Sequence, residues 1–163
     1  MTQIDIRPLS TSDPAALGCV TAFFAELNQT FPGGFDPGPP AAWGLEKLDP
    51  PHGAFLVAFD GPRPVGCVGV TRLSPETAEI KRLWTDRSCR GLGLGQRLMA
   101  EIQAKAVSLG ATRLVLDTSR HLPAAVAFYR RVGWIEIARY NDNPYAHHFF
   151  ERPLSGPPHR PQP

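Results

Sequence analysis

Three glycines at alternate positions, Gly91, Gly93 and Gly95, mark the stretch of this sequence most suited to chemistry. An extended run precedes them and a helical pattern begins at about Leu94, so the loop joins a strand end to a helix N-terminus. The backbone N–H groups of a first helical turn have no partner inside the helix, and the helix dipole is positive there. Such a loop attracts phosphate, and glycine lets a phosphate approach the backbone closely.

The glycine spacing excludes two common nucleotide-binding loops. A dinucleotide loop, Gly-x-Gly-x-x-Gly, would need its third glycine at Gln96 or Leu98. A Walker loop would need Gly-Lys followed by Ser or Thr, which is absent. The stretch instead fits Arg/Gln-x-x-Gly-x-Gly/Ala, with Arg90, Gly93 and Gly95 at the specified positions. A glycine-rich turn without a ligand is the alternative.

The composition predicts one globular α/β domain at residues 1–154, followed by a proline-rich tail at residues 155–163. The chain has 163 residues, of which 42% are hydrophobic, and its 17 basic and 15 acidic residues give a net charge of +2. This balance argues against a nucleic-acid partner. No apolar run approaches the roughly 20 residues that span a bilayer, so no membrane partner is expected.

The cysteines predict a reduced, cytoplasmic protein. Cys19, Cys67 and Cys89 are odd in number, widely spaced and without a metal-ligand spacing, so we expect no metal site. The N-terminal residues lack the charged and apolar regions of a signal peptide.

Hydrophobic periodicity and turn signals predict the order β, α, α, β, β, β, α, β, α, β, β. The expected strands cover residues 3–9, 54–59, 64–73, 78–85, 113–117, 134–140 and 147–152. The expected helices begin at Pro14 and cover residues 41–48, 94–109 and 123–132. On the first helix, the apolar face consists of Leu17, Val20, Phe23, Phe24 and Leu27. Short breaks between residues 54 and 85 imply an antiparallel meander, and the strand after the 94–109 helix implies a parallel crossover.

Three blocks in order resemble the GNAT superfamily of acetyl-CoA-dependent N-acetyltransferases. The first is the strand Glu79–Thr85, and the second is the glycine loop. The third follows the pattern Ala-x-x-Phe-Tyr-x-x-x-Gly-Phe/Trp and is matched by Ala125, Phe128, Tyr129, Gly133 and Trp134. The resemblance implies a mixed, largely antiparallel sheet of about seven strands, splayed between strands 4 and 5, with about four helices.

The resemblance also implies a site for acetyl-CoA in that gap. The pantetheine arm would bond to the free backbone of Leu83 and Thr85, as an added strand does. The amides from Arg90 to Gln96 would hold the pyrophosphate. The expected cofactor-binding residues are Leu83, Trp84, Thr85, Arg90, Gly91, Leu92, Gly93, Leu94, Gly95 and Gln96.

Two residues carry the catalytic expectations. In the family, a tyrosine at the position of Tyr129 protonates the departing coenzyme A thiolate. Its alternative is a core tyrosine packed beside Phe128. Glu79 is the candidate base, because an ammonium substrate must lose a proton before it attacks a carbonyl; its alternatives are ordered water as the base and a simple pair with Lys81. Lys81 and Arg82 could recognise a carboxylate on the acceptor, or be solvated or paired.

These features together predict an enzyme that transfers acetyl from acetyl-CoA to a primary amine of a small molecule or peptide by direct attack. The rival hypothesis is a non-catalytic domain that binds or senses acyl-CoA. The family resemblance also allows a homodimer. The acceptor is expected to be shaped by the loop from Asn28 to Gly53 and by the late strands, and no motif identifies it.

Overall fold

The computed structural model describes residues 3–154, and the predicted tail at residues 155–163 lies outside the described residues. Seven strands form one sheet, in the order β1-β2-β3-β4-β5-β7-β6. They are β1 (Ile4–Pro8), β2 (Gly53–Asp60), β3 (Arg63–Arg72), β4 (Thr77–Thr85), β5 (Arg113–Thr118), β6 (Ile135–Ile137) and β7 (His148–Pro153). Every neighbouring pair is antiparallel except β4 and β5, which are parallel. The mixed, seven-stranded fold expected from the sequence is therefore confirmed.

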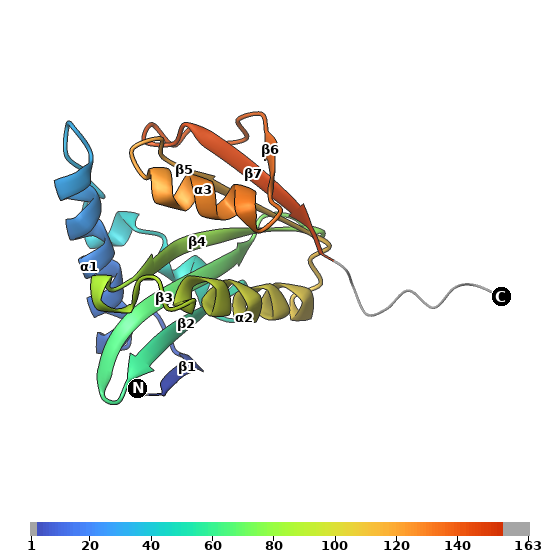
Figure 1. The fold of residues 1–163 in the computed structure, drawn as a ribbon. Coiled ribbons are helices and arrows are strands. Elements are labelled where there is room, and N and C mark those ends of the chain that lie inside the picture. Colours follow the sequence, from blue (N-terminus) through green and yellow to red (C-terminus); the bar gives the residue numbers. More distant parts are fainter. Residues whose placement is uncertain (1–2, 155–163) are drawn as a thin grey trace.

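Three α-helices cover the two faces of the sheet (Figure 1). The helix α1 (Pro14–Thr30) packs with β2 and β3 in one buried cluster, whereas α2 (Leu94–Ser108) and α3 (Pro123–Arg131) share the other cluster. Asp13 begins α1, because its carboxylate accepts a hydrogen bond from the Ala15 amide at 2.9 Å and Pro14 fits the first turn. Gly110, with φ of 91°, follows the end of α2 as the expected C-terminal cap.

The expected helix at residues 41–48 is wrong. Two short 3-10 turns, η1 (Pro40–Ala42) and η2 (Leu45–Leu48), occupy this segment. Gly44 lies between them with φ of 67°, a left-handed conformation that interrupts a right-handed helix. The structure thus has three α-helices in the described residues rather than about four.

Two finer expectations also differ from the structure. The buried residues of α1 are Ala16, Cys19, Val20, Phe24 and Leu27, so Val20, Phe24 and Leu27 are buried as expected, whereas Leu17 is 37% exposed. The strand expected at residues 134–140 stops at Ile137. Beyond it the chain turns away from the sheet, and the Arg139 guanidinium donates to the backbone carbonyls of Asn141, Asn143 and Ala146.

The sheet opens between β4 and β5, as the resemblance implied. The two strands pair only from Thr77–Arg113 to Glu79–Val115, although β4 continues to Thr85 and β5 to Thr118. Further along, β4 pairs only with β3 and β5 only with β7. Beyond Glu79, the edges of β4 and β5 that face each other are therefore not paired with any strand.

Candidate active site

A cavity of about 750 Å³ occupies this opening. It is walled by α1, β4, β5 and α3 and by the segment 140–146, which connects β6 to β7. Glu79, Leu83 and Tyr129 line it together, so the structure brings both expected catalytic residues to one space. The alternating glycines lie beyond the end of β4, where η3 (Arg87–Cys89) leads into α2.

The glycine loop presents a run of unpaired amides. Within the described residues, no backbone N–H from Gly91 to Gln96 donates a hydrogen bond, and the first to do so is that of Arg97, to the Gly93 carbonyl at 3.1 Å. Gly91 and Gly93 adopt φ of 81° and 80°, which favours glycine. Gly95 has an ordinary helical backbone, and a β-carbon there would meet no atom within 4 Å. The fold itself therefore does not require glycine at position 95.

The Arg90 side chain turns away from these amides. Its Nε and Nη2 atoms donate to the Thr85 carbonyl at 3.1 and 2.9 Å, and Nη2 also pairs with the Glu26 carboxylate on α1. Glu26 accepts a second hydrogen bond, at 3.0 Å, from the indole nitrogen of Trp84. These bonds fasten the start of the glycine loop to α1.

The three expected contacts at the end of β4 point in different directions. Leu83 lines the cavity and packs against the core cluster of α2 and α3. The Trp84 side chain packs on the opposite face, with the cluster of α1. The Thr85 carbonyl already accepts the two hydrogen bonds from Arg90. Only Leu83 of this group presents its side chain to the cavity.

Glu79 is the last residue of β4 that pairs with β5, and the two strands diverge beyond it. Its side chain is 6% exposed, and its carboxylate lies 3.0 Å from the Lys81 ammonium. Tyr140 donates a hydrogen bond to the same carboxylate at 2.6 Å. The pair with Lys81 weighed as an alternative role is therefore present, yet Glu79 still faces the cavity.

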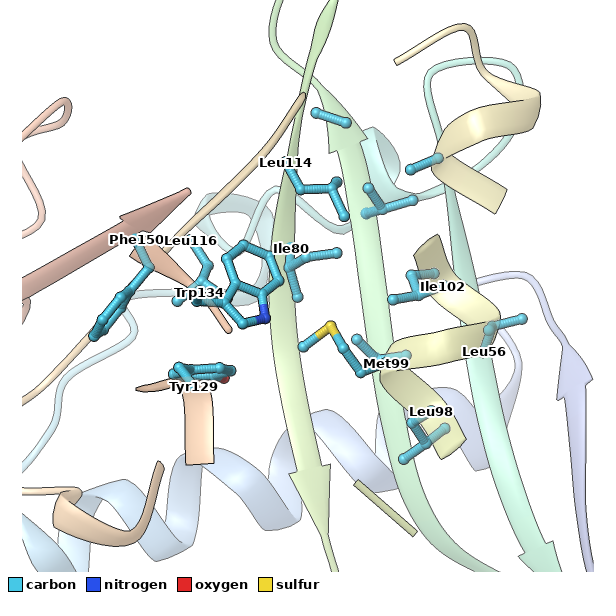
Figure 2. Close-up of a cluster of buried hydrophobic side chains, with 14 of the residues drawn as sticks. Leu56, Ile80, Leu98, Met99, Ile102, Leu114, Leu116, Tyr129, Trp134 and Phe150 are labelled. Carbon is cyan, nitrogen blue, oxygen red and sulfur yellow. The ribbon is translucent and has the colours of Figure 1, made fainter. Parts of the chain in front are cut away.

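Tyr129 belongs both to the core and to the cavity wall. It is 7% exposed, and its ring contacts those of Phe128, Trp134 and Phe150 at centroid distances of 5.5, 6.0 and 5.8 Å. Figure 2 shows it beside Trp134 in the buried cluster. Burial, and secondarily the Asp117 carboxylate, raises the pKa of Tyr129 well above its ordinary value. The hydroxyl therefore keeps its proton at neutral pH and can donate it into the cavity.

Arg82 occupies a β-bulge in the middle of the site. Between the pairs Cys67–Trp84 and Gly69–Lys81, β4 has two residues where β3 has one. Arg82 has φ of 59°, and it is the one residue other than glycine with a positive φ in the described part of the chain. Bulges beside active sites redirect a side chain. Arg82 lines the cavity as a result.

Sequence reasoning did not anticipate the polar cluster opposite β4. Asp117 on β5 accepts hydrogen bonds from the side-chain amides of Asn141 at 2.6 Å and Asn143 at 3.3 Å. Tyr140 reaches Glu79 from the same segment. The Asn-Asp-Asn-Pro run at residues 141–144 signalled a turn, but nothing in it indicated that the turn closes over β5.

Neither a membrane span nor a metal cluster is found between residues 3 and 154. No helix in that range is long and apolar enough to cross a bilayer. No group of three or more His, Cys, Asp or Glu side chains there is placed to hold a metal ion.

The chain is similar in sequence to known acetyltransferases. The sequence profile of the acetyltransferase (GNAT) family matches residues 20–134. N-alpha-acetyltransferase RimI of Mycobacterium tuberculosis is 33% identical over 133 residues, which cover 77% of this chain and 82% of that protein. An uncharacterized N-acetyltransferase of Schizosaccharomyces pombe is 39% identical over 102 residues, which cover 61% of this chain and 63% of the yeast protein.

Solved structures agree on the fold. An acetyltransferase of the GNAT family from Staphylococcus aureus superposes with a TM-score of 0.78 at 19% identity, covering 94% of this chain and all of the other. An acetyltransferase from Streptococcus agalactiae gives a TM-score of 0.77 at 21% identity, covering 93% of this chain and 98% of that one.

Proposed function

We propose that this chain, which belongs to the acetyltransferase (GNAT) family, transfers an acetyl group from acetyl-CoA to a primary amine of a small molecule or peptide. The observation that carries the proposal is the opening between β4 and β5: its cavity is lined by Glu79 and Tyr129, and β4 leads from it through η3 to a loop of unpaired amides. Acyl transfer from acetyl-CoA would use all three features. The opening would take the extended pantetheine arm, the amides would bind the pyrophosphate, and Glu79 and Tyr129 would transfer protons at the thioester.

The residues present fit coenzyme A. The amides from Gly91 to Gln96 suit a pyrophosphate, because they lie at the N-terminus of a 15-residue helix and Gly95 leaves room for close approach. The unpaired edge of β4 near Leu83 suits the amide groups of a pantetheine arm, which can hydrogen-bond as an added strand does. Arg90 contributes its backbone and braces the loop through Thr85 and Glu26 rather than contributing a free charge.

The proposed chemistry is a direct acyl transfer. Acetyl-CoA supplies a thioester carbonyl that is already activated. Glu79 accepts a proton from the substrate ammonium, so that the nitrogen lone pair is free to attack. The amide C–N bond forms, the C–S bond breaks, and Tyr129 holds a proton at its hydroxyl for the departing sulfur. The net products are the acetylamide, the coenzyme A thiol and one proton.

Binding and turnover together test the proposal. We expect calorimetry to detect acetyl-CoA, and to detect ATP and NAD weakly or not at all. We expect free thiol to appear with at least one amine of a broad panel. Absence of acetyl-CoA binding would remove the basis of the proposal. Binding without thiol release for any amine would favour the rival hypothesis of a non-catalytic acyl-CoA-binding domain.

Tyr129→Phe tests whether the Tyr129 hydroxyl is the general acid of an active enzyme. Loss of the hydroxyl should lower kcat by about 100-fold, a typical contribution of general acid catalysis. Acetyl-CoA affinity should stay unchanged, because the ring and its core contacts remain. Phe128→Leu is a control that perturbs the neighbouring aromatic without touching the hydroxyl. Full turnover by Tyr129→Phe would show that the acid is another group.

The cysteines suit the proposed cytoplasmic location. Cys19, Cys67 and Cys89 are all free and buried. Free thiols persist most readily in a reducing compartment.

A further inference from the structure

Arg82 is held in a conformation that the backbone disfavours. A left-handed conformation costs a residue with a β-carbon roughly 1–2 kcal/mol, and such residues gather at functional sites. The positive φ of 59° and the extra residue of the bulge direct the Arg82 side chain into the cavity rather than onto β3. The fold thus maintains a local strain that places one guanidinium in the site.

The contacts of this guanidinium leave most of its donors unused. Nη2 donates one hydrogen bond, to the Trp43 carbonyl at 3.2 Å, and the group lies 5.0 Å from the centre of the Phe24 ring. Nε is buried and has no hydrogen-bond partner in residues 3–154. Arg82 also takes part in none of the ion pairs in that range. A guanidinium has five N–H donors and strongly prefers to use them when it is buried.

The other charged groups near Arg82 are already engaged. Lys81, the second cation of β4, pairs with Glu79 at 3.0 Å. Asp117 accepts from two asparagine amides. Burial lowers the pKa of the Arg82 guanidinium, and the more distant Asp117 and Glu79 carboxylates oppose that effect. Within the described cavity wall, Arg82 is therefore the cation that lacks an anionic partner in contact.

We propose that Arg82 binds a carboxylate of the acceptor, so that the acceptor is an amine of the amino-acid type. Guanidinium and carboxylate are matched in plane and in charge, and their hydrogen bonds are among the strongest in proteins. Glu79 lies three residues earlier on β4 and lines the same cavity, where the ammonium of the same molecule would share its carboxylate with Lys81. The cavity then presents an anion for one end of a zwitterion and a cation for the other.

This inference rests on the proposed acetyl transfer and specifies the acceptor within it. If Arg82 only braced Trp43 against α1, its substitution would lower stability and would change the rates with all acceptors equally. A carboxylate-binding role would change the discrimination between acceptors. The two roles are therefore separable by a ratio of rates.

The experiment uses matched acceptors and the full-length protein. Thiol release is measured with each standard L-amino acid and with short ω-amino acids, and then with the corresponding carboxamides, which keep the amine and remove the negative charge. We expect the best carboxylate acceptor to exceed its amide in kcat/KM by about 10–100-fold, the range of a charge-assisted hydrogen bond. The difference should lie mainly in KM.

Variants of Arg82 then assign the preference. Arg82→Gln should reduce the carboxylate-to-amide ratio to near one, and Arg82→Lys should restore part of it because it keeps the charge. Arg87→Gln removes the same charge from an exposed position outside the cavity wall and should leave the ratio unchanged. Thermal unfolding of each variant checks that it folds, and the lysine variant provides the test if the glutamine variant does not.

The outcomes distinguish a failure of the carboxylate site from a failure of the proposed acetyl transfer. Equal or better use of the amides, or an unchanged ratio in Arg82→Gln and Arg82→Lys, would overturn the carboxylate site. Thiol release only with amines that carry no carboxylate would overturn it as well. Failure of every amine, despite acetyl-CoA binding, would instead count against the proposed transfer itself.

Discussion

The two parts of the proposed site use different kinds of groups. The proposed donor end consists of backbone amides from Gly91 to Gln96, supplied by one loop and one helix turn. The proposed acceptor end consists of the side chains of Glu79, Arg82, Asp117 and Tyr140, which come from β4, β5 and the segment beyond β6. In the proposed reaction, the first would recognise a group common to every coenzyme A molecule, and the second would recognise one particular amine.

This difference explains how specificity can change on a constant frame. The backbone amides of the donor end depend on glycine conformations and on the helix N-terminus, so few substitutions are compatible with it. The acceptor end depends on side chains that can be exchanged while the strands remain in register. Arg90 and Glu26 connect the two regions, since the loop is fastened to the helix whose aromatic residues wall the cavity.

The largest effect expected in this comparison is at the acceptor end. Glu79→Gln keeps the shape of the side chain and a group that can accept from Tyr140, but it removes the proposed proton acceptor. We expect kcat at neutral pH to fall by about 100-fold, with acetyl-CoA affinity unchanged. The defect should shrink toward high pH, because an acceptor amine then loses its proton in solution.

Glu76→Gln provides a matched control for that measurement. Glu76 is exposed, lies just before β4 and is absent from the cavity wall. Its pH–rate profile should follow that of the native protein. An unchanged kcat in Glu79→Gln at neutral pH would assign deprotonation to water.

An intermediate effect is expected at the donor end, where two glycines should respond in opposite ways. Gly95→Ala adds a β-carbon that meets no protein atom within 4 Å, so stability should rise by about 0.5–1 kcal/mol from helix propensity. Acetyl-CoA affinity should fall about 10-fold, equivalent to roughly 1.4 kcal/mol, if phosphate approaches that turn. Calorimetry and thermal unfolding measure the two quantities.

Gly93→Ala is the contrasting variant. Its φ of 80° makes alanine strained, so stability should drop by about 1 kcal/mol. A Gly95→Ala protein that binds acetyl-CoA as tightly as the native chain would move the pyrophosphate away from the first turn of α2.

The smallest effect is expected outside both regions, at Glu136 on β6. Hydrogen bonds from Arg130 and His148 lower the pKa of Glu136. A carboxylate with a depressed folded pKa stabilises the fold above its unfolded pKa, and this contribution is lost as pH falls through the folded pKa. Glu136→Gln should therefore lower the free energy of unfolding by less than about 0.5 kcal/mol at pH 7, because the pair is exposed.

That difference should vanish in acid. Denaturant unfolding of Glu136→Gln and the native protein, from pH 7 down through the folded pKa of Glu136, measures it. Acetyl transfer should be the same in both proteins. A stability difference that does not shrink as pH falls through that pKa would mean that the contribution of Glu136 is not electrostatic.

The fold was predictable from sequence because its signals are local, and the glycine loop that leads into α2 has a local signal as well. Strand alternation, the cap at Asp13 and the glycine spacing each act within a few residues. Where local signals conflicted, the prediction was wrong: Gly44 divides an apparently helical segment into two turns. The strand predicted to reach Tyr140 ends at Ile137. Beyond it the chain turns away from the sheet, and Tyr140 makes a tertiary contact instead, the hydrogen bond to Glu79.

The acceptor end could not be predicted in the same way. The bulge at Arg82 arises from a mismatch in register between β3 and β4, which no periodicity within β4 alone specifies. Lys81 and Arg82 are adjacent in sequence and chemically alike, yet one is paired with Glu79 and the other has no ionic partner in the described residues. Both side chains line the cavity, and only their contacts separate a paired charge from a candidate ligand.

The opening between β4 and β5 also determines what kind of chain can enter the sheet. Unpaired strand edges usually invite another polypeptide and lead to aggregation unless they are covered. Here α1 lies against one face of the sheet and α3 against the other, and both wall the cavity, so the side chains of an incoming peptide strand, which alternate between the two faces, would meet these helices. A molecule with amide groups and few substituents would meet less of an obstacle. The helices that wall the cavity therefore favour such a molecule over a peptide strand at these open edges.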